Sequence, residues 1–223
     1  MSADLIYSII HLRSKRLVAI IIQVCLCRLD LLLLIAIERY DNDRQTKSSS
    51  LVNHLQFMTY KLLFVCLGNI CRSPSAENIM NHLIKEAGLE DKITCDSAGT
   101  SGYHIGAPPD ERMNVAANKR GLKLQGKSRK LKPLDLQRFD LILAMDRENY
   151  QDIVYLDREG KYEDKVRMIC EFATQKKDKE VPDPYYGGLD GFDYVIDLLF
   201  DACAGLLDYV VNSPEYQAKT HQS

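Results

Sequence analysis

The sequence predicts an α/β fold: a single three-layer domain with a four-stranded parallel sheet flanked by helices, preceded by an N-terminal extension. Two observations support this prediction. From residue 60 onwards, four short strand-like segments alternate with helical patterns, and such alternation is typical of parallel sheets with helices on both faces. The chain of 223 residues also has the length of one domain plus an extension.

The first half of this pattern contains two strands and two helices, expected at Tyr60–Cys66, Pro74–Ala87, Lys92–Asp96 and Pro109–Arg120. Glycines follow both helices, Gly88 and Gly121, at the position where helices commonly end. The second helix also has proline in its first turn. Residues 97–102, Ser-Ala-Gly-Thr-Ser-Gly, are expected to form a loop after the second strand.

The second half is expected to contain strands at Phe139–Met145 and Lys165–Cys170, a charged loop over residues 172–190 and a final helix at Phe192–Val211. Asp146 directly follows the third strand. Its short acceptor side chain is suited to cap a helix, so a helix is expected to begin there. Apolar residues of the final helix recur at helical spacing, which predicts an amphipathic helix.

Composition excludes several classes of function. Lys and Arg number 29 against 31 Asp and Glu, so there is no basic excess for nucleic acid. The seven cysteines are odd in number and irregularly spaced, unlike a secreted disulfide framework. They form no pair of C-x-x-C motifs for zinc. We therefore expect no nucleic-acid partner, no zinc site built on paired C-x-x-C motifs, and a reducing, cytoplasmic location.

Residues 1–57 differ from the rest of the chain. An apolar stretch from Leu17 to Ile37 is interrupted by Arg28 and Asp30, and such charges each cost about 2.5–3.5 kcal/mol near a bilayer centre. Three interpretations remain open: a membrane or targeting anchor, a partly buried helix without catalytic role, or a segment absent from the native protein. The third is favoured, because Met58 stands directly before the first strand. Membrane contact is expected only if residues 1–57 belong to the working protein.

A candidate anion-binding loop joins the first strand to the first helix. Its residues are Cys66, Leu67, Gly68, Asn69, Ile70, Cys71, Arg72 and Ser73. Backbone N–H groups of a loop that enters a helix converge on anions, and the helix dipole favours negative charge there. The loop therefore predicts a phosphate-binding site.

Individual side chains of this loop fit catalysis at phosphorus. The positive surroundings favour Cys66 as a thiolate nucleophile. Gly68 allows a close approach of the backbone, and Asn69 tolerates a left-handed conformation. Arg72 offers a planar fork for two phosphate oxygens, and Ser73 can donate a hydrogen bond to the sulfur. The spacing of cysteine and arginine alone is also compatible with a buried structural thiol.

The complete string C-L-G-N-I-C-R-S-P after a strand resembles the signature of the low-molecular-weight protein tyrosine phosphatases. The resemblance covers about residues 60–212 and includes CDSAGTSGYHIG and VPDPYYGG, spellings most similar to bacterial, especially cyanobacterial, and plant members. It implies that residues 58–223 form a phosphotyrosine phosphatase domain. The implied reaction hydrolyses phosphotyrosine in a protein substrate through a cysteinyl-phosphate, without metal or cofactor.

The segment Val-Pro-Asp-Pro-Tyr-Tyr at residues 181–186 supplies a candidate general acid. A tyrosyl oxygen is a poor leaving group as an anion, so an acid should protonate it. Prolines stiffen the backbone around Asp183, although a simple turn aspartate would look the same. The resemblance implies that Asp183 is the general acid and that Tyr185 and Tyr186 line the slot for a phenyl ring.

The resemblance also implies a supporting hydrogen-bond network behind the loop. Asn69 would be the left-handed residue of that network, and Ser97 one of its partners. Animal relatives often complete the network with a histidine. Here the matching stretch is Gly-Lys-Ser-Arg at residues 126–129, so Ser128 would have to replace that histidine.

Further positions carry over from the family. Tyr103 and His104 fall where pocket-rim side chains are expected, although a lone loop histidine is more often solvated. Cys71 corresponds to a second loop cysteine that can bond reversibly to Cys66 under oxidation. A buried, inert thiol is the alternative interpretation of Cys71.

Three other functions are compatible with parts of the pattern. A protein arginine phosphatase carries threonine where Ile70 stands, and Ile70 is better suited to a phenyl ring. A thioredoxin-linked arsenate reductase needs clustered additional cysteines, whereas Cys95 and Cys170 are distant and lie in predicted strands. A phosphate-binding module without turnover is disfavoured by the joint presence of nucleophile, arginine and candidate acid.

Overall fold

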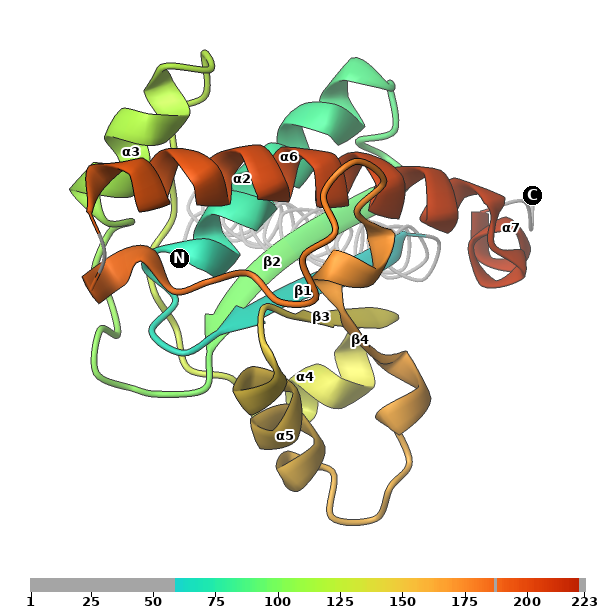
Figure 1. The fold of residues 1–223 in the computed structure, drawn as a ribbon. Helices are drawn as coiled ribbons and strands as arrows, with labels where there is room; N and C mark the ends of the chain where they lie inside the picture. Colours follow the sequence, from blue (N-terminus) through green and yellow to red (C-terminus); the bar gives the residue numbers. More distant parts are fainter. Residues whose placement is uncertain (1–58, 187, 221–223) are drawn as a thin grey trace, which may run out of the picture. The chain divides into compact units, whose positions relative to one another are not determined.

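The computed structural model describes residues 59–186 and 188–220, and element labels follow Figure 1. The expectations for residues 1–57 lie outside these residues. Within the described part of the chain, no helix is long and apolar enough to cross a membrane.

A four-stranded parallel sheet forms the centre of the domain (Figure 1). Its strands are β1 (Tyr60–Cys66), β2 (Ile93–Gly99), β3 (Leu141–Ala144) and β4 (Val166–Met168), in the order β2-β1-β3-β4. The predicted fold class is therefore confirmed. The order places β1 between β2 and β3, so the end of β1, where the candidate loop begins, lies in the middle of the carboxyl edge of the sheet.

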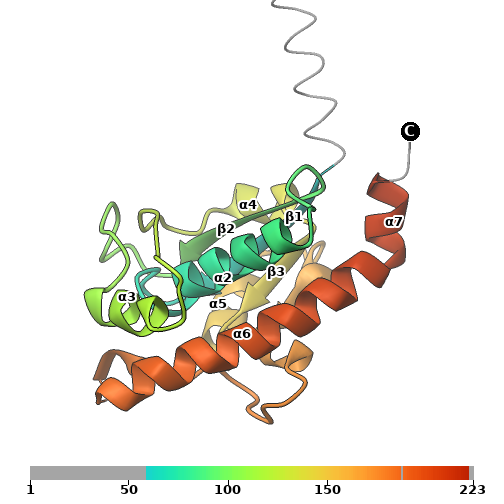
Figure 2. The same cartoon turned by 90° about the horizontal axis from the view of Figure 1, so that it is seen from above.

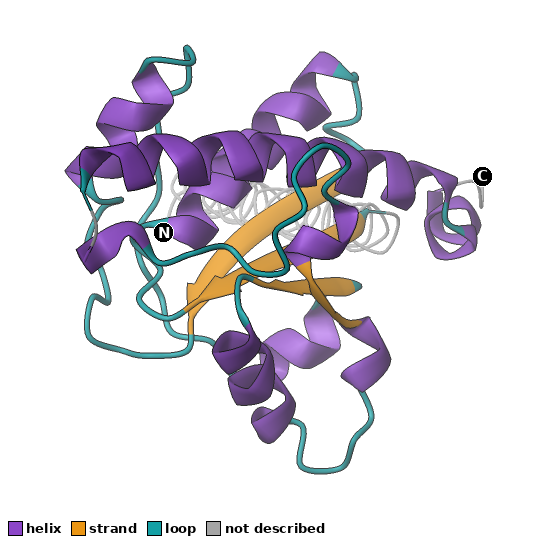
Figure 3. Ribbon diagram, in the orientation of Figure 1, coloured by secondary structure: helices purple, strands orange, loops and turns teal. Residues whose placement is uncertain are grey.

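Helices cover both faces of the sheet (Figures 1, 2 and 3). The helices are α2 (Arg72–Glu86), α3 (Glu111–Asn118), α4 (Pro133–Arg138), α5 (Arg147–Leu156), α6 (Leu189–Asn212) and α7 (Pro214–Thr220), with 3₁₀ turns η1 (Glu163–Lys165), η2 (Ile169–Phe172) and η3 (Pro184–Tyr186). Helices α2, α3 and α6 pack on one face, and α4 and α5 lie on the other. Strand side chains point alternately to the two faces of the sheet. Phe64 therefore packs in the apolar cluster that includes residues of α2 and α6. Leu63 and Val65 pack in the cluster on the other face, which includes residues of α4 and α5.

Local chemistry explains where the principal helices begin and end. Asp146 accepts a 2.7 Å hydrogen bond from the backbone of Asn149 and caps α5, as expected. Asp110 caps α3 in the same way, through the backbone N–H of Arg112. Gly88 follows α2 with a φ of 66°, a conformation that glycine adopts without steric cost.

The structure corrects the predicted limits of two strands. Strand β2 continues through Ser97, Ala98 and Gly99, which were expected to begin a loop. They pair with β1 along its whole length, up to Cys66 opposite Gly99, so sheet pairing overrides their turn-like composition. The fourth strand is shorter than predicted, and Cys170 lies in the 3₁₀ turn η2.

Two helices were not predicted. Helix α4 is only six residues long, and its first turn is closed by Asp135, which accepts a hydrogen bond from the backbone of Lys132 at 2.9 Å. Helix α7 follows a break at Ser213 and begins with Pro214. Tyr216 of α7 packs edge-on against Tyr60 of β1, so α7 covers the start of the central strand.

Candidate active site

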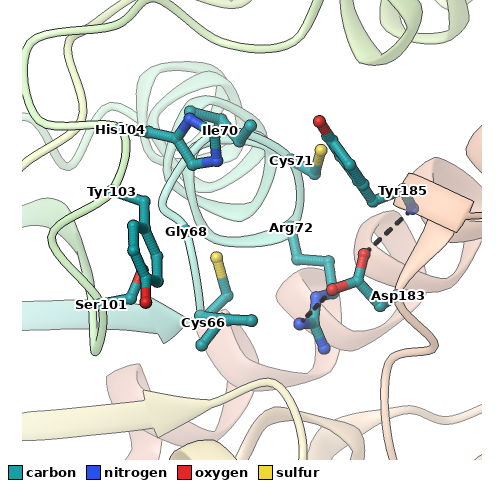
Figure 4. Close-up of a pocket in the computed structure, with 11 residues that line it drawn as sticks. Cys66, Gly68, Ile70, Cys71, Arg72, Ser101, Tyr103, His104, Asp183 and Tyr185 are labelled. Atoms are coloured by element: carbon teal, nitrogen blue, oxygen red, sulfur yellow. Dashed lines mark hydrogen bonds and ion pairs between the residues drawn. The ribbon is translucent and has the colours of Figure 1, made fainter.

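A pocket of about 350 Å³ opens at the carboxyl end of β1 (Figure 4). Its lining residues are Cys66, Leu67, Gly68, Ile70, Cys71, Arg72, Ser101, Tyr103, His104, Asp183 and Tyr185. The structure thus brings together segments that are far apart in the sequence: the loop before α2, the loop after β2 and the segment before α6. All but one of these residues, Ser101, were candidate site residues.

The Cys66 side chain is 2% exposed and lies at the base of the pocket. Its sulfur is 3.0 Å from the Ser73 hydroxyl oxygen and accepts a hydrogen bond from the Asn69 backbone N–H at 3.2 Å. The Asn69 N–H, and the Ser73 hydroxyl when it donates, are thus directed at one sulfur. The loop therefore supports Cys66 as the nucleophile.

A network of hydrogen bonds behind the loop holds Asn69, whose φ of 53° is left-handed, as expected. Its side-chain amide donates to the hydroxyl groups of Ser73 at 3.0 Å and Ser97 at 2.8 Å. Its carbonyl oxygen accepts from the backbone of Arg129 at 2.8 Å. Ser73 accepts from Asn69, and its own proton has two acceptors within reach, the Cys66 sulfur at 3.0 Å and the Ala98 carbonyl at the longer distance of 3.4 Å.

The proposed replacement of histidine by Ser128 is wrong in its details. The Ser128 hydroxyl donates to the Gly68 carbonyl at 3.1 Å, and the structure shows no hydrogen bond between it and the Asn69 side chain. The residue that continues the network is Glu77 of α2, which accepts from Ser97 at 2.6 Å. Glu77 lies in the second turn of α2 and faces β2. The sequence did not reveal this contact, because the predicted second strand ended before Ser97.

Burial raises the pKa of Glu77 to about 7, although the Ser97 hydrogen bond opposes this effect. Between pH 4.5 and 7 the folded protein therefore binds a proton at Glu77 that the unfolded chain has lost. Stability contributed by the protonated carboxyl is present below pH 4.5 and is lost as the pH rises toward 7.

We expect Glu77→Gln to flatten this pH dependence. The free energy of unfolding of the wild-type protein should fall, relative to the variant, by no more than about 3 kcal/mol between pH 4.5 and 7.5. Urea denaturation of both proteins across this range measures the difference. Parallel curves would show that Glu77 does not titrate in this way.

Arg72 is 3% exposed and joins the loop to two carboxylates. Its guanidinium donates to Asp146, to the Val181 carbonyl at 3.1 Å and to Asp183 at 2.9 Å. Burial alone would lower the pKa of Arg72, but the Cys66 sulfur, Asp183 and Asp146 outweigh it, and the pKa is raised. The arginine is therefore a permanent cation beside the sulfur.

Asp146 was predicted only as a helix cap, and its contact with Arg72 was missed. A signal was present, because Asp146 follows β3 directly and parallel strands end at the same edge of a sheet. The same reasoning applies to Ser101, which follows β2. Its hydroxyl oxygen is buried without a hydrogen-bond partner in the structure, although the residue lines the pocket.

The Asp183 carboxyl reaches the pocket from the segment before α6 (Figure 4). One oxygen accepts from Arg72, and the other accepts from the Tyr185 backbone N–H at 3.0 Å. Tyr185 forms a wall of the pocket. The side chain of Tyr186 lies outside the described part of the structure.

The opposite wall consists of the loop after β2, with Tyr103 and His104 at the rim, as expected (Figure 4). The His104 ring packs against Gly68, where an added Cβ would lie 3.1 Å from the ring. Glycine at this position therefore lets the rim approach the loop. An aromatic wall on each side leaves a slot suited to a planar ring.

Cys71, the second cysteine of the loop, is buried. Burial, with the negative charges of Asp110, Cys66 and Asp183, raises its pKa to about 12. Cys71 is therefore a protonated thiol at neutral pH, and only one of the two loop cysteines is suited to act as a nucleophile.

Within the described residues, no group of three or more His, Cys, Asp or Glu side chains could hold a metal ion.

Gly99, at the end of β2, leaves room for the backbone of the phosphate-binding loop. A Cβ at this position would lie 2.8 Å from the Leu67 carbonyl oxygen and 3.2 Å from the Asn69 backbone nitrogen. Both atoms are backbone, so the loop itself would have to move. Gly99→Ala is expected to lower kcat/KM by about 10- to 100-fold, because small displacements of catalytic groups are costly.

Steady-state kinetics on an aryl phosphate measures this effect, and Gly102→Ala is the matched control. A Cβ at Gly102 would meet only the Ile105 and Lys130 side chains, at 3.4 Å and 3.6 Å, so activity should stay within about twofold. Full activity of Gly99→Ala would contradict the requirement for this space.

Comparison with known proteins identifies relatives of the whole domain. Residues 61–216 match the family model described as low molecular weight phosphotyrosine protein phosphatase. A Synechocystis sp. protein provisionally named a low molecular weight protein-tyrosine-phosphatase is 60% identical over 147 residues, which cover 66% of this chain and 94% of that protein.

Two solved structures extend this comparison. The Entamoeba histolytica protein tyrosine phosphatase is 46% identical, with a TM-score of 0.67 and coverage of 69% of this chain and 97% of that one. A Drosophila arginine phosphatase is 30% identical, with a TM-score of 0.63 and coverage of 69% and 99%. Sequence and fold agree: this chain belongs to the low molecular weight phosphotyrosine protein phosphatase family.

Proposed function

We propose that residues 58–223 hydrolyse phosphotyrosine in proteins through a cysteinyl-phosphate intermediate. The observation that carries the proposal is that the Cys66 sulfur, the Arg72 guanidinium and the Asp183 carboxyl all line one pocket. A nucleophile, a cation for the phosphoryl oxygens and a proton donor are together sufficient for the reaction.

In the first step, the Cys66 thiolate attacks phosphorus. The sulfur–phosphorus bond forms as the bond between phosphorus and the tyrosyl oxygen breaks, and Asp183 transfers its proton to that oxygen. Arg72 and the N–H groups of the loop hold the phosphoryl oxygens, where charge is concentrated. Tyrosine leaves as a neutral phenol.

In the second step, Asp183, now ionised, takes a proton from a water molecule that attacks phosphorus. The sulfur–phosphorus bond breaks, inorganic phosphate leaves and the thiolate is restored. No electrons are gained or lost, and the carboxyl ends with the proton with which it began. Because the sulfur must remain reduced between turnovers, we place the protein in a reducing compartment such as the cytoplasm.

The walls of the pocket support phosphotyrosine as substrate. Tyr103 and Tyr185 stand on opposite sides of the pocket and Ile70 lines it, which gives an apolar slot for a phenyl ring. A guanidinium group would lose hydration in such a slot without gaining a charged partner from Ile70. Because one similar solved structure is an arginine phosphatase, phosphoarginine is the alternative substrate that the experiment must include.

The test compares three reactions of the full-length protein. Phosphate release is measured from a phosphotyrosine peptide and from phosphoarginine, and arsenate reduction is measured with thioredoxin. We expect turnover of the phosphotyrosine peptide only. Preferential turnover of phosphoarginine, or reduction of arsenate, would overturn the proposed substrate.

A further inference from the structure

Arg72 faces competing demands in the proposed reaction. Its guanidinium holds Asp183 at 2.9 Å, yet the same guanidinium must bind the oxygens of the phosphoryl group. When phosphate engages Arg72, the link between the loop and the general acid weakens. A second anchor that contacts no phosphate would keep the acid in place.

Asp110 and Arg112 provide such an anchor at the start of α3. The Arg112 guanidinium binds the Asp110 carboxylate through two hydrogen bonds, from Nε at 3.0 Å and from Nη2 at 2.8 Å. This forked arrangement fixes the plane of the guanidinium. The Asp110 backbone N–H in turn donates to the Ile70 carbonyl at 2.8 Å, which ties the pair to the phosphate-binding loop.

The other side of the Arg112 guanidinium contacts the segment that carries the acid. Its Nη1 donates to the Tyr185 carbonyl at 3.3 Å, and its central carbon lies 5.0 Å from the centre of the Tyr185 ring. It also lies 4.6 Å from the centre of the Phe192 ring in α6. Both separations are within the range of cation–π attraction.

Tyr185 passes this restraint to Asp183, because the Tyr185 backbone N–H donates to the carboxyl oxygen that Arg72 does not bind. We propose that Arg112 is a positioning residue: it holds Tyr185, and through it Asp183, over the phosphate-binding loop while Arg72 is engaged by the substrate. This inference rests on the proposed function and adds to it a residue that touches neither phosphate nor the reacting atoms.

The test uses Arg112→Met, which keeps an unbranched stem but removes the fork, and Arg112→Lys, which keeps the charge. With phenyl phosphate, whose leaving group needs protonation, kcat/KM, which reports the first step alone, should fall about 10- to 50-fold in Arg112→Met and less in Arg112→Lys. With p-nitrophenyl phosphate, whose leaving group is more acidic, the loss should be below about threefold. Inhibition by inorganic phosphate should be unchanged within about twofold.

A double-variant cycle separates positioning from general damage. If Arg112 acts through Asp183, then Arg112→Met should cost less than about threefold in the background of Asp183→Ala. Arg120→Met is the matched control, because Arg120, which lies just after α3, pairs with Asp193 and Asp197 of α6. It should lower the midpoint of thermal unfolding and leave the ratio of the two aryl phosphate rates unchanged.

Equal losses on both substrates, or a full loss retained in the Asp183→Ala background, would overturn the positioning role. That outcome is distinct from failure of the proposed function. If the proposed function fails, the wild-type protein itself lacks phosphatase activity. If only the positioning role fails, the wild-type protein is active and the Arg112 variants do not show the expected difference between substrates.

Discussion

Cys66→Ser is expected to abolish phosphatase activity, with a loss of at least about 10⁴-fold in kcat. The Ser73 hydroxyl and the Asn69 backbone N–H both contact the Cys66 sulfur. A serine hydroxyl ionises far less readily than a thiol, so these donors would face a neutral oxygen. Among the described residues, His104 is the histidine that lines the pocket; its ring packs on Gly68, and no hydrogen bond joins it to Cys66, so it is not placed to remove the proton instead.

The measurement is phosphate release from a phosphotyrosine peptide, with mass spectrometry of the quenched wild-type reaction to detect phosphate on Cys66. Cys95→Ser is the matched control: Cys95 lies in β2 outside the pocket, and its thiol donates to Asn81. A hydroxyl can make the same hydrogen bond, so activity should be retained. Activity of Cys66→Ser within tenfold of the wild type would contradict a sulfur nucleophile.

The phosphate-binding loop could be predicted because its information is local. A strand, a short loop with Gly68 and Asn69, and a helix start follow one another in the chain, and each requirement falls on a neighbouring residue. The four-stranded sheet could be predicted because strand-like segments alternate with helical patterns, and two of the strands, β1 and β3, are strongly apolar. The carboxyl edge of a parallel sheet then brought the loops after β1 and β2 together.

Long-range contacts account for most of what was missed. Glu77 completes the Asn69 network only because β2 extends to Gly99 and carries Ser97 against α2. Arg112 matters because α3 places it against Tyr185, far away in the sequence. Neither residue has a local pattern that distinguishes it from an ordinary surface residue of a helix. The short helices α4 and α7 were missed because helical periodicity is hard to recognise over six or seven residues.

Asp183→Ala is expected to lower kcat/KM by about 10²- to 10³-fold on a phosphotyrosine peptide, within the usual range for loss of a general acid. The ratio kcat/KM reports the first step, whereas kcat also includes the second step, in which Asp183 acts on water whatever the leaving group was. The reason is the basicity of the departing oxygen: a tyrosyl phenol has a pKa near ~10, so without a donor it must leave as an unstable anion. A more acidic phenol leaves readily without a proton. The loss on p-nitrophenyl phosphate should therefore be below about tenfold.

A second effect of the substitution has to be separated from proton transfer, because Asp183 also binds Arg72. Asp146→Asn is the matched control. Asp146 is another carboxylate partner of Arg72, and asparagine preserves the oxygen that caps α5. This variant weakens the support of Arg72 but keeps the acid, so its loss should be similar on both substrates. A proton donor is indicated if Asp183→Ala, unlike Asp146→Asn, loses more activity on the phosphotyrosine peptide than on p-nitrophenyl phosphate. Equal losses from Asp183→Ala on the two substrates would instead mean that Asp183 only supports Arg72.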